Sequence, residues 1–198
     1  MRIPRQLAGF AVIALLGLAS PALAADDAAS FIAQTGDAVL SLARDRNLSD
    51  EQLKERLRTI TAQDFDSPGI AQFVLGRHWR SASDAEREQF VKAFEEYMVQ
   101  VYATRFRQFS GAVLKVVGQR QDGQSAVVST EIEQASGQPP AKVIWQVAKQ
   151  PNGFKITDVS IEGISQAVTY RQEFSSVIEQ HGGQVSALTQ ELLQKARD

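Results

Sequence analysis

The segment from Phe154 to Phe174, which reads FKITDVSIEGISQAVTYRQEF, places a strand-type pattern directly before a helical one. Its first half is rich in β-branched residues, which favour strands. Its second half repeats apolar residues, Ile164, Val168 and Phe174, at intervals that put them on one face of a helix. The strand and the helix must diverge at Gly163, so the fold has to combine both element types.

The strand in this segment changes phase along its length. Its apolar side begins on even positions, at Phe154 and Ile156, and ends on odd ones, at Val159 and Ile161. A β-bulge near Asp158 that bends the sheet would produce this change. A strand covered on both faces at different points would give the same sequence.

Helical periodicity and helix-end signals occur on both sides of the strand region. Helices are predicted for Asp27–Arg44, from Ser49 onward, from Ser67-Pro68 to Gly76 and from Ser83 to about Phe109. A closing pair of helices is divided at residues 181–183, and its first member is the helix after Gly163. The helices after Ser49 and Ser83 begin with capping boxes, because Gln or Glu follows three residues later.

The stretch between these helices alternates with a period of two after Ser110-Gly111. Turn signals at Asp122-Gly123, residues 136–140 and Asn152-Gly153 divide it into four strands. Short connections favour antiparallel neighbours. The sequence therefore predicts an α+β fold, with a curved four-stranded antiparallel sheet wrapped by about six helices. A curved sheet leaves a volume that helices must fill or a ligand must occupy.

The N-terminal 24 residues have the pattern of a secretory signal peptide. Arg2 and Arg5 precede an apolar stretch from Leu7 to Leu18, and small residues follow up to Ala24. Residues 25–198 then form one domain of 174 residues, within the usual range for a single domain. Without the two leader arginines, 19 basic residues stand against 23 acidic ones, a net charge of −4 that argues against a nucleic-acid partner.

The side chains that carry catalysis or bind metals are sparse. There is no Cys, and the two histidines, His78 and His181, lie in no metal or nucleophile motif. The sharpest enzymatic interpretation makes Asp158 a general base in a ketosteroid-isomerase-like cavity, with Tyr97 or Tyr102 as a donor. The alternative, which we favour, has Asp158 bonded to backbone at a bulge or to an arginine such as Arg171. We expect no cofactor and no metal.

The helix after Ser83 carries an unusually aromatic face. Such a face is more often core than ligand site, but export without an anchor and a bent strand favour a cavity. From periodicity alone the pocket choices are Phe94, Tyr97, Met98, Val101 and Trp145.

Four short motifs, in this order and spacing, resemble the MlaC family of periplasmic phospholipid-binding proteins. They are LGRHW at Leu75–Trp79, ERxxF at Glu86–Phe90, IEGIS at Ile161–Ser165 and YRQEF at Tyr170–Phe174. The resemblance implies helices around a curved sheet that encloses lipid acyl chains. In the last strand the chain has Phe154 and Thr157 where the family commonly has Trp and Tyr, which leaves the fold expectation intact.

The resemblance also implies roles for individual residues. Ile164 and Val168 would line the acyl pocket, and Glu162 and Arg171 would lie at its rim or at a docking surface. The complete set of expected lipid contacts is Val74, Leu75, Trp79, Phe90, Phe94, Tyr97, Met98, Val101, Tyr102, Val143, Trp145, Val147, Val159, Ile161, Ile164, Val168 and Phe174.

The function expected from this resemblance is that of a monomeric periplasmic carrier of phospholipid, or of hopanoid-type lipid, which a related branch handles. Its partners would be an inner-membrane ABC transporter with a periplasmic lipid-binding ring and an outer-membrane lipoprotein complex. The alternatives are the small cavity enzyme described above and a ligand-free adaptor for an envelope complex.

Overall fold

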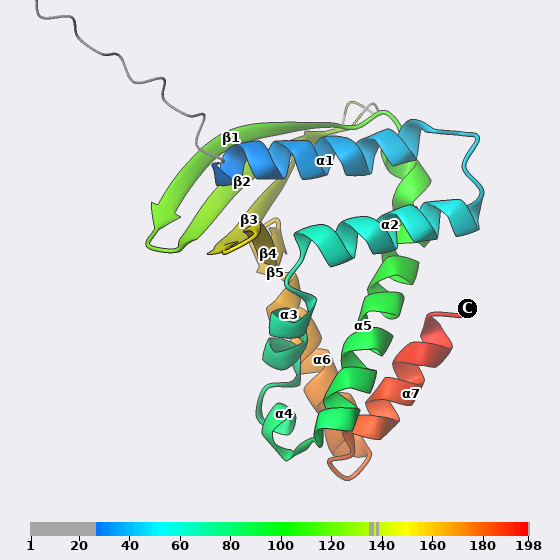
Figure 1. Ribbon diagram of the computed structural model, residues 1–198. Helices are drawn as coiled ribbons and strands as arrows, with labels where there is room; N and C mark the ends of the chain where they lie inside the picture. The colour runs from blue at the N-terminus through cyan, green and yellow to red at the C-terminus, as the bar shows by residue number, and fades with distance from the viewer. Residues whose placement is uncertain (1–26, 135–136, 138, 198) are drawn as a thin grey trace, which may run out of the picture.

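The computed structural model describes residues 27–134, 137 and 139–197, and the expected leader lies outside them. The described residues form an α+β fold of seven α-helices, one 3-10 turn and a curved five-stranded sheet (Figure 1). The helices are α1 (Ala28–Arg44), α2 (Asp50–Asp64), α3 (Ser67–Leu75), α4 (Arg77–Ser81), α5 (Asp84–Arg105), the 3-10 turn η1 (Phe106–Phe109), α6 (Gln166–Gln180) and α7 (Val185–Lys195). The strands are β1 (Val113–Asp122), β2 (Ser125–Glu133), β3 (Ala141–Gln150), β4 (Gly153–Ile161) and β5 (Ile164–Ser165).

The sheet is the predicted antiparallel meander, in the order β1-β2-β3-β4-β5. The prediction of four strands is wrong by one, because the two-residue β5 folds back on the end of β4. Glu162 and Gly163 form the turn with φ of 49° and 81°, which suits a tight hairpin. Two residues are too few to show a period of two in the sequence.

Of the two interpretations of the phase change in the last strand, the structure has the bulge. Gln146 of β3 pairs with Asp158 of β4, and the next residue, Val147, pairs with Ile156, so Thr157 is the extra residue. This insertion moves the apolar side chains of β4 from even to odd positions. It therefore keeps Ile156 and Val159 on the same side of the sheet while bending the strand.

The helix boundaries follow local capping chemistry. Both predicted capping boxes are formed, at Ser49 and at Ser83. Gly76 ends α3 as predicted, in a left-handed conformation (φ 53°), and α4 starts directly after it. The helix that begins after Ser83 is shorter than predicted, because it ends at Arg105 and continues only as η1.

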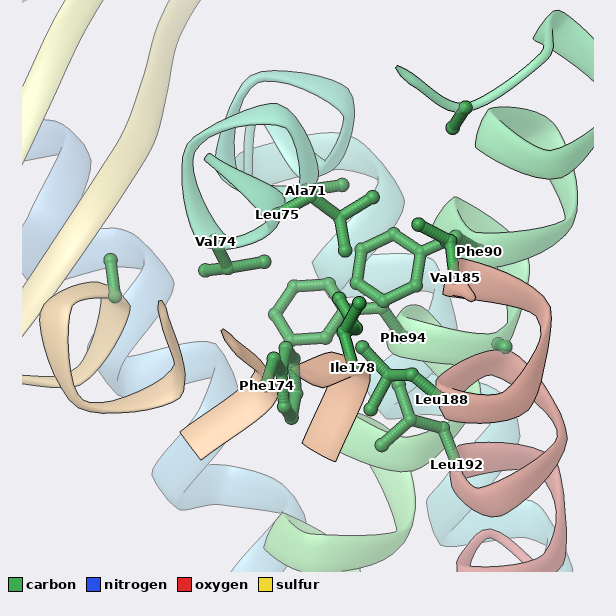
Figure 2. Packing of buried hydrophobic residues seen from close by; sticks show 13 residues of the cluster. Ala71, Val74, Leu75, Phe90, Phe94, Phe174, Ile178, Val185, Leu188 and Leu192 are labelled. Atoms are coloured by element: carbon green, nitrogen blue, oxygen red, sulfur yellow. The ribbon is translucent and has the colours of Figure 1, made fainter. Parts of the chain in front are cut away.

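Buried apolar side chains form three separate clusters. The largest joins α3, α5, α6 and α7, and Figure 2 shows Phe90, Phe94 and Phe174 at its centre. Phe174 meets both other rings edge-on, with centroids 6.0 and 5.9 Å away. A second cluster lies between α1 and the sheet around Ile32 and Val128, and a third joins α1, α2, α5 and η1. In Figure 1, α1 lies across the sheet and the large helical cluster extends below it.

Candidate functional site

Exposed apolar side chains gather where β4, β5 and α6 meet. Ile161 is 40% exposed, Ile164 61% and Val168 44%. Single exposed apolar residues are common on protein surfaces. Here, however, Ile161 and Ile164 are register partners across the β4–β5 hairpin, and Val168 lies in the first turn of α6. The three side chains therefore form one apolar surface at this corner.

Tyr102 on α5 lies close to the same corner. Its side chain is 42% exposed, yet desolvation by the surrounding protein raises the pKa of its phenol, and the nearby Asp158 carboxylate raises that pKa further. We call the surface formed by Tyr102, Ile161, Ile164 and Val168 the apolar recess.

Tyr170 on α6 connects the apolar recess to the large core. Burial raises the pKa of its phenol, with further contributions from neighbouring Tyr102 and Tyr97. The ring of Tyr170 meets that of Tyr97 edge-on at 6.2 Å and contacts Phe174 at 5.4 Å. Tyr170 thus packs within a cluster of aromatic rings next to Tyr102.

Asp158 holds the corner together. Its Oδ1 accepts hydrogen bonds from the backbone N–H groups of Val159 (2.8 Å) and Ala167 (3.0 Å), and its Oδ2 accepts one from Ser165 Oγ (2.6 Å). Ser165 in turn caps α6 by accepting from Val168 N–H at 3.1 Å. The structural interpretation of Asp158 is confirmed, with backbone and Ser165 as its partners in place of Arg171. With both oxygens engaged in this way, the carboxylate is poorly placed to act as a base.

Glu162 lies at the tip of the β4–β5 hairpin, next to the apolar recess. It is a non-glycine residue in the left-handed region, with φ 49°. Its Oε1 accepts a hydrogen bond from Lys142 N–H (2.6 Å), and its own N–H donates to the Lys142 carbonyl (2.9 Å). These bonds hold the hairpin against β3 and offset the strain of the left-handed backbone. Backbone strain of this kind tends to occur at the functional sites of proteins.

The residues predicted to contact lipid divide by burial into three sets. The exposed ones are Tyr102, Ile161, Ile164 and Val168, and those of intermediate exposure are Trp79, Tyr97, Met98, Val101, Trp145 and Val159. At most 4% of the surface is exposed for Val74, Leu75, Phe90, Phe94, Val143, Val147 and Phe174. Contact of any of them with lipid stays a prediction.

Three features of the site region escaped the sequence-based prediction. Tyr170 shares a helix face with Phe174, and that spacing could have identified it. Thr130 accepts the Trp145 Nε1–H bond at 2.9 Å and is fully buried, but nothing in the sequence distinguishes it from other strand threonines. Arg171 turns away from Asp158 and stacks 5.0 Å over the ring of Phe73, a contact between distant parts of the chain.

The two histidines have structural surroundings. His181 is the C-cap of α6, and its Nδ1 lies 2.9 Å from the Val177 carbonyl, as predicted for a helix end. His78 is buried in α4 beside Arg77. Within residues 27–134, 137 and 139–197, no three His, Asp or Glu side chains form a group that could hold a metal ion. None of the helices described is long and apolar enough to cross a membrane.

Comparisons with known proteins agree on one family. Residues 33–194 match the sequence profile of the family described as MlaC protein. The intermembrane phospholipid transport system binding protein MlaC of Haemophilus influenzae is 26% identical over 151 residues, which cover 68% of this chain and 71% of that protein. A phospholipid-binding protein from Ralstonia solanacearum, solved in complex with a phospholipid, superposes with a TM-score of 0.75 at 25% identity, covering 86% of this chain and 97% of the other.

Proposed function

Because the chain belongs to the MlaC family, we propose that it is a phospholipid carrier whose acyl-chain site opens at the apolar recess. The observation that supports this most is the similarity over nearly the whole fold to a protein solved with a phospholipid bound. The recess offers an apolar surface of the kind that such a ligand requires, since Ile161, Ile164 and Val168 are apolar and exposed.

The energetics of lipid transfer explain why such a surface is needed. Removing about 30 methylenes of two acyl chains from water, at roughly 0.8 kcal/mol each, is worth on the order of 20–25 kcal/mol gross. A free phospholipid therefore does not cross water quickly. A carrier removes most of that exposure, and its affinity must approximately match those of the donor and acceptor so that the lipid is released.

The setting of this transport follows from the leader and the family. We propose that residues 1–24 direct export and are removed, and that residues 25–198 act in the periplasm as one domain. An inner-membrane ABC transporter and an outer-membrane lipoprotein complex are the proposed exchange partners. Phospholipid is favoured over hopanoid because the similar solved structure holds a phospholipid. Glu162, whose bonds to Lys142 fix the hairpin tip, would stand at the rim of the site.

Native mass spectrometry of the purified protein, followed by lipid extraction, tests this function. We expect stoichiometric phospholipid in the wild-type protein and its loss in Ile164→Glu and Val168→Glu, because each places a charge against acyl chains. Val117→Glu is the matched control, since Val117 is 57% exposed on the edge strand β1, away from the recess. Retention of lipid in both recess variants, or its loss in the control as well, contradicts the assigned site. A wild-type protein that accepts no lipid from vesicles contradicts the function itself.

A further inference from the structure

A groove lies on the helical part of the molecule, between α3, α4 and α6. It encloses about 480 Å³ and is lined by the aromatic side chains Phe73 and Trp79, by Gly76, and by Arg77, Arg80 and Arg171. Phe73 is 42% exposed, although it is a large apolar residue. None of these side chains belongs to the apolar recess, so this arginine groove is a second surface.

Arg171 is held in place by the groove itself. Its guanidinium carbon lies 5.0 Å from the centre of the Phe73 ring, which is stacking distance for a cation–π contact. A side chain at position 76 would meet the guanidinium, because a Cβ built there would lie 3.0 Å from Arg171 Nε and 3.1 Å from Nη2. Glycine at position 76 therefore makes room for the Nε and Nη2 side of the guanidinium.

The charge in the arginine groove is only partly compensated. Arg77 pairs with Glu179 of α6. Within the residues that the structure describes, neither Arg80 nor Arg171 forms a salt bridge. Two guanidinium groups thus face the groove without carboxylate partners, on a chain whose net charge is negative. A fixed guanidinium recognises a carboxylate through two parallel hydrogen bonds.

The composition and shape of the groove fit a protein segment better than a membrane. Aromatic residues and arginine are the types enriched at protein interfaces and among their energetic hot spots. A membrane surface gives only about 1 kcal/mol per basic residue and attracts larger basic clusters. The groove has only three arginines, and one of them is already paired. A recessed site of this kind suits an inserted protein side chain better than it suits a flat layer of lipid headgroups.

We propose that the arginine groove docks an acidic segment of a partner protein, with Glu or Asp carboxylates on Arg80 and Arg171 and an apolar side chain against Phe73 and Trp79. The proposal rests on the proposed function in so far as a carrier must dock where it loads and unloads. The arginine groove shares no residue with the apolar recess.

Fluorescence anisotropy with a short labelled peptide of repeated Glu-Leu pairs tests the docking chemistry on the full mature chain. We expect saturable binding that weakens with salt, and about tenfold weaker binding for Arg171→Gln and for Arg80→Gln, because each removes a charge-assisted pair. Arg171→Lys, which keeps the charge but loses the planar fork, should fall between Arg171→Gln and wild type. Arg120→Gln, on β1, is the charge-matched control and should bind as wild type does.

Other outcomes overturn the proposal. If both Gln variants bind the peptide as tightly as wild type does, carboxylate recognition at this groove is ruled out. The same conclusion follows if wild type binds a peptide with Gln in place of Glu as tightly as the Glu peptide. If the protein binds phosphatidylglycerol vesicles through these arginines and does not bind the peptide, the groove recognises a membrane and not a protein. If the wild type forms a dimer that Arg80→Gln abolishes, the groove binds a second copy of this chain. Lipid content, measured in every variant, should stay at the wild-type level; its loss with either arginine would assign them to the lipid site. A lipid-free wild type that still binds the peptide refutes the carrier function alone.

Discussion

Replacing Asp158 with alanine tests whether one carboxylate fixes the corner that carries the apolar recess. Of the three hydrogen bonds to Asp158, those from Ser165 Oγ and Ala167 N–H join β4 to the start of α6, and the third comes from Val159 N–H within β4. Ala167, one of the two backbone donors, is only 6% exposed, so water replaces the carboxylate poorly there. Ser165 Oγ is less enclosed and keeps its capping bond to Val168.

The expected cost follows from these surroundings. A buried donor left without an acceptor costs about 1–3 kcal/mol. Loss of a negative charge beside the N-terminus of a helix adds about 0.3–1 kcal/mol. Asp158→Ala should therefore lower the free energy of unfolding by about 1–4 kcal/mol, which for a domain of this size lowers Tm by roughly 3–16 °C. Asp158→Asn keeps an acceptor of the same shape and should cost about 1 kcal/mol.

Urea unfolding followed by circular dichroism measures both variants under the same conditions. A midpoint that moves at constant slope reports a change in stability alone. Asp158→Ala as stable as wild type refutes the corner interpretation. Equal losses for Asn and Ala mean that the charge, and not the geometry of the acceptor, stabilises the corner. The lipid content of the folded protein should stay unchanged in Asp158→Asn, because both oxygens of Asp158 already accept hydrogen bonds within the protein.

Two further perturbations test the turn and a helix start. Glu162→Gly and Glu162→Ala both lose the hydrogen bond from Lys142 N–H, but only Gly relieves the backbone strain of the left-handed conformation. The Gly variant should therefore be more stable than the Ala variant by about 1 kcal/mol in urea unfolding. Equal stability of the two variants contradicts the presence of strain. Hydrogen bonds from Ser83 lower the pKa of Glu86 below its usual 4.5, so its contribution to stability is present above that value and is lost as pH falls through the lower folded-state pKa. Glu86→Gln should thus lose less stability than wild type between neutral pH and about pH 3, measured by urea midpoints, and parallel losses would contradict this.

Features set by neighbouring residues could be predicted from the sequence. The capping boxes at Ser49 and Ser83 depend on a residue three positions away, and the structure forms both. The bulge at Thr157 was visible as a change of phase within one strand. The hairpin to β5 was missed because its strand has two residues, and α5 was overextended because apolar periodicity continues through η1.

Features set by distant contacts could not be predicted in this way. Periodicity identifies the apolar face of α5, but it does not show that Phe94 is covered by protein while Tyr102 on the same helix is 42% exposed. The groove is a stronger case, since Arg171 and Phe73 are far apart in the chain and meet only because α3 packs on α6. Identity and spacing report which surfaces are apolar, whereas tertiary packing decides which of them stay open.

The side chains that stay open are not those that hold the fold together. Ile161, Ile164 and Val168 are absent from all three buried clusters, each of which closes without them. The three buried clusters are therefore built from other side chains. A lipid that binds only the folded state adds stability by mass action. Ile164→Glu should consequently leave the unfolding free energy of lipid-free protein near the wild-type value, so that loss of lipid in this variant reports on binding and not on folding.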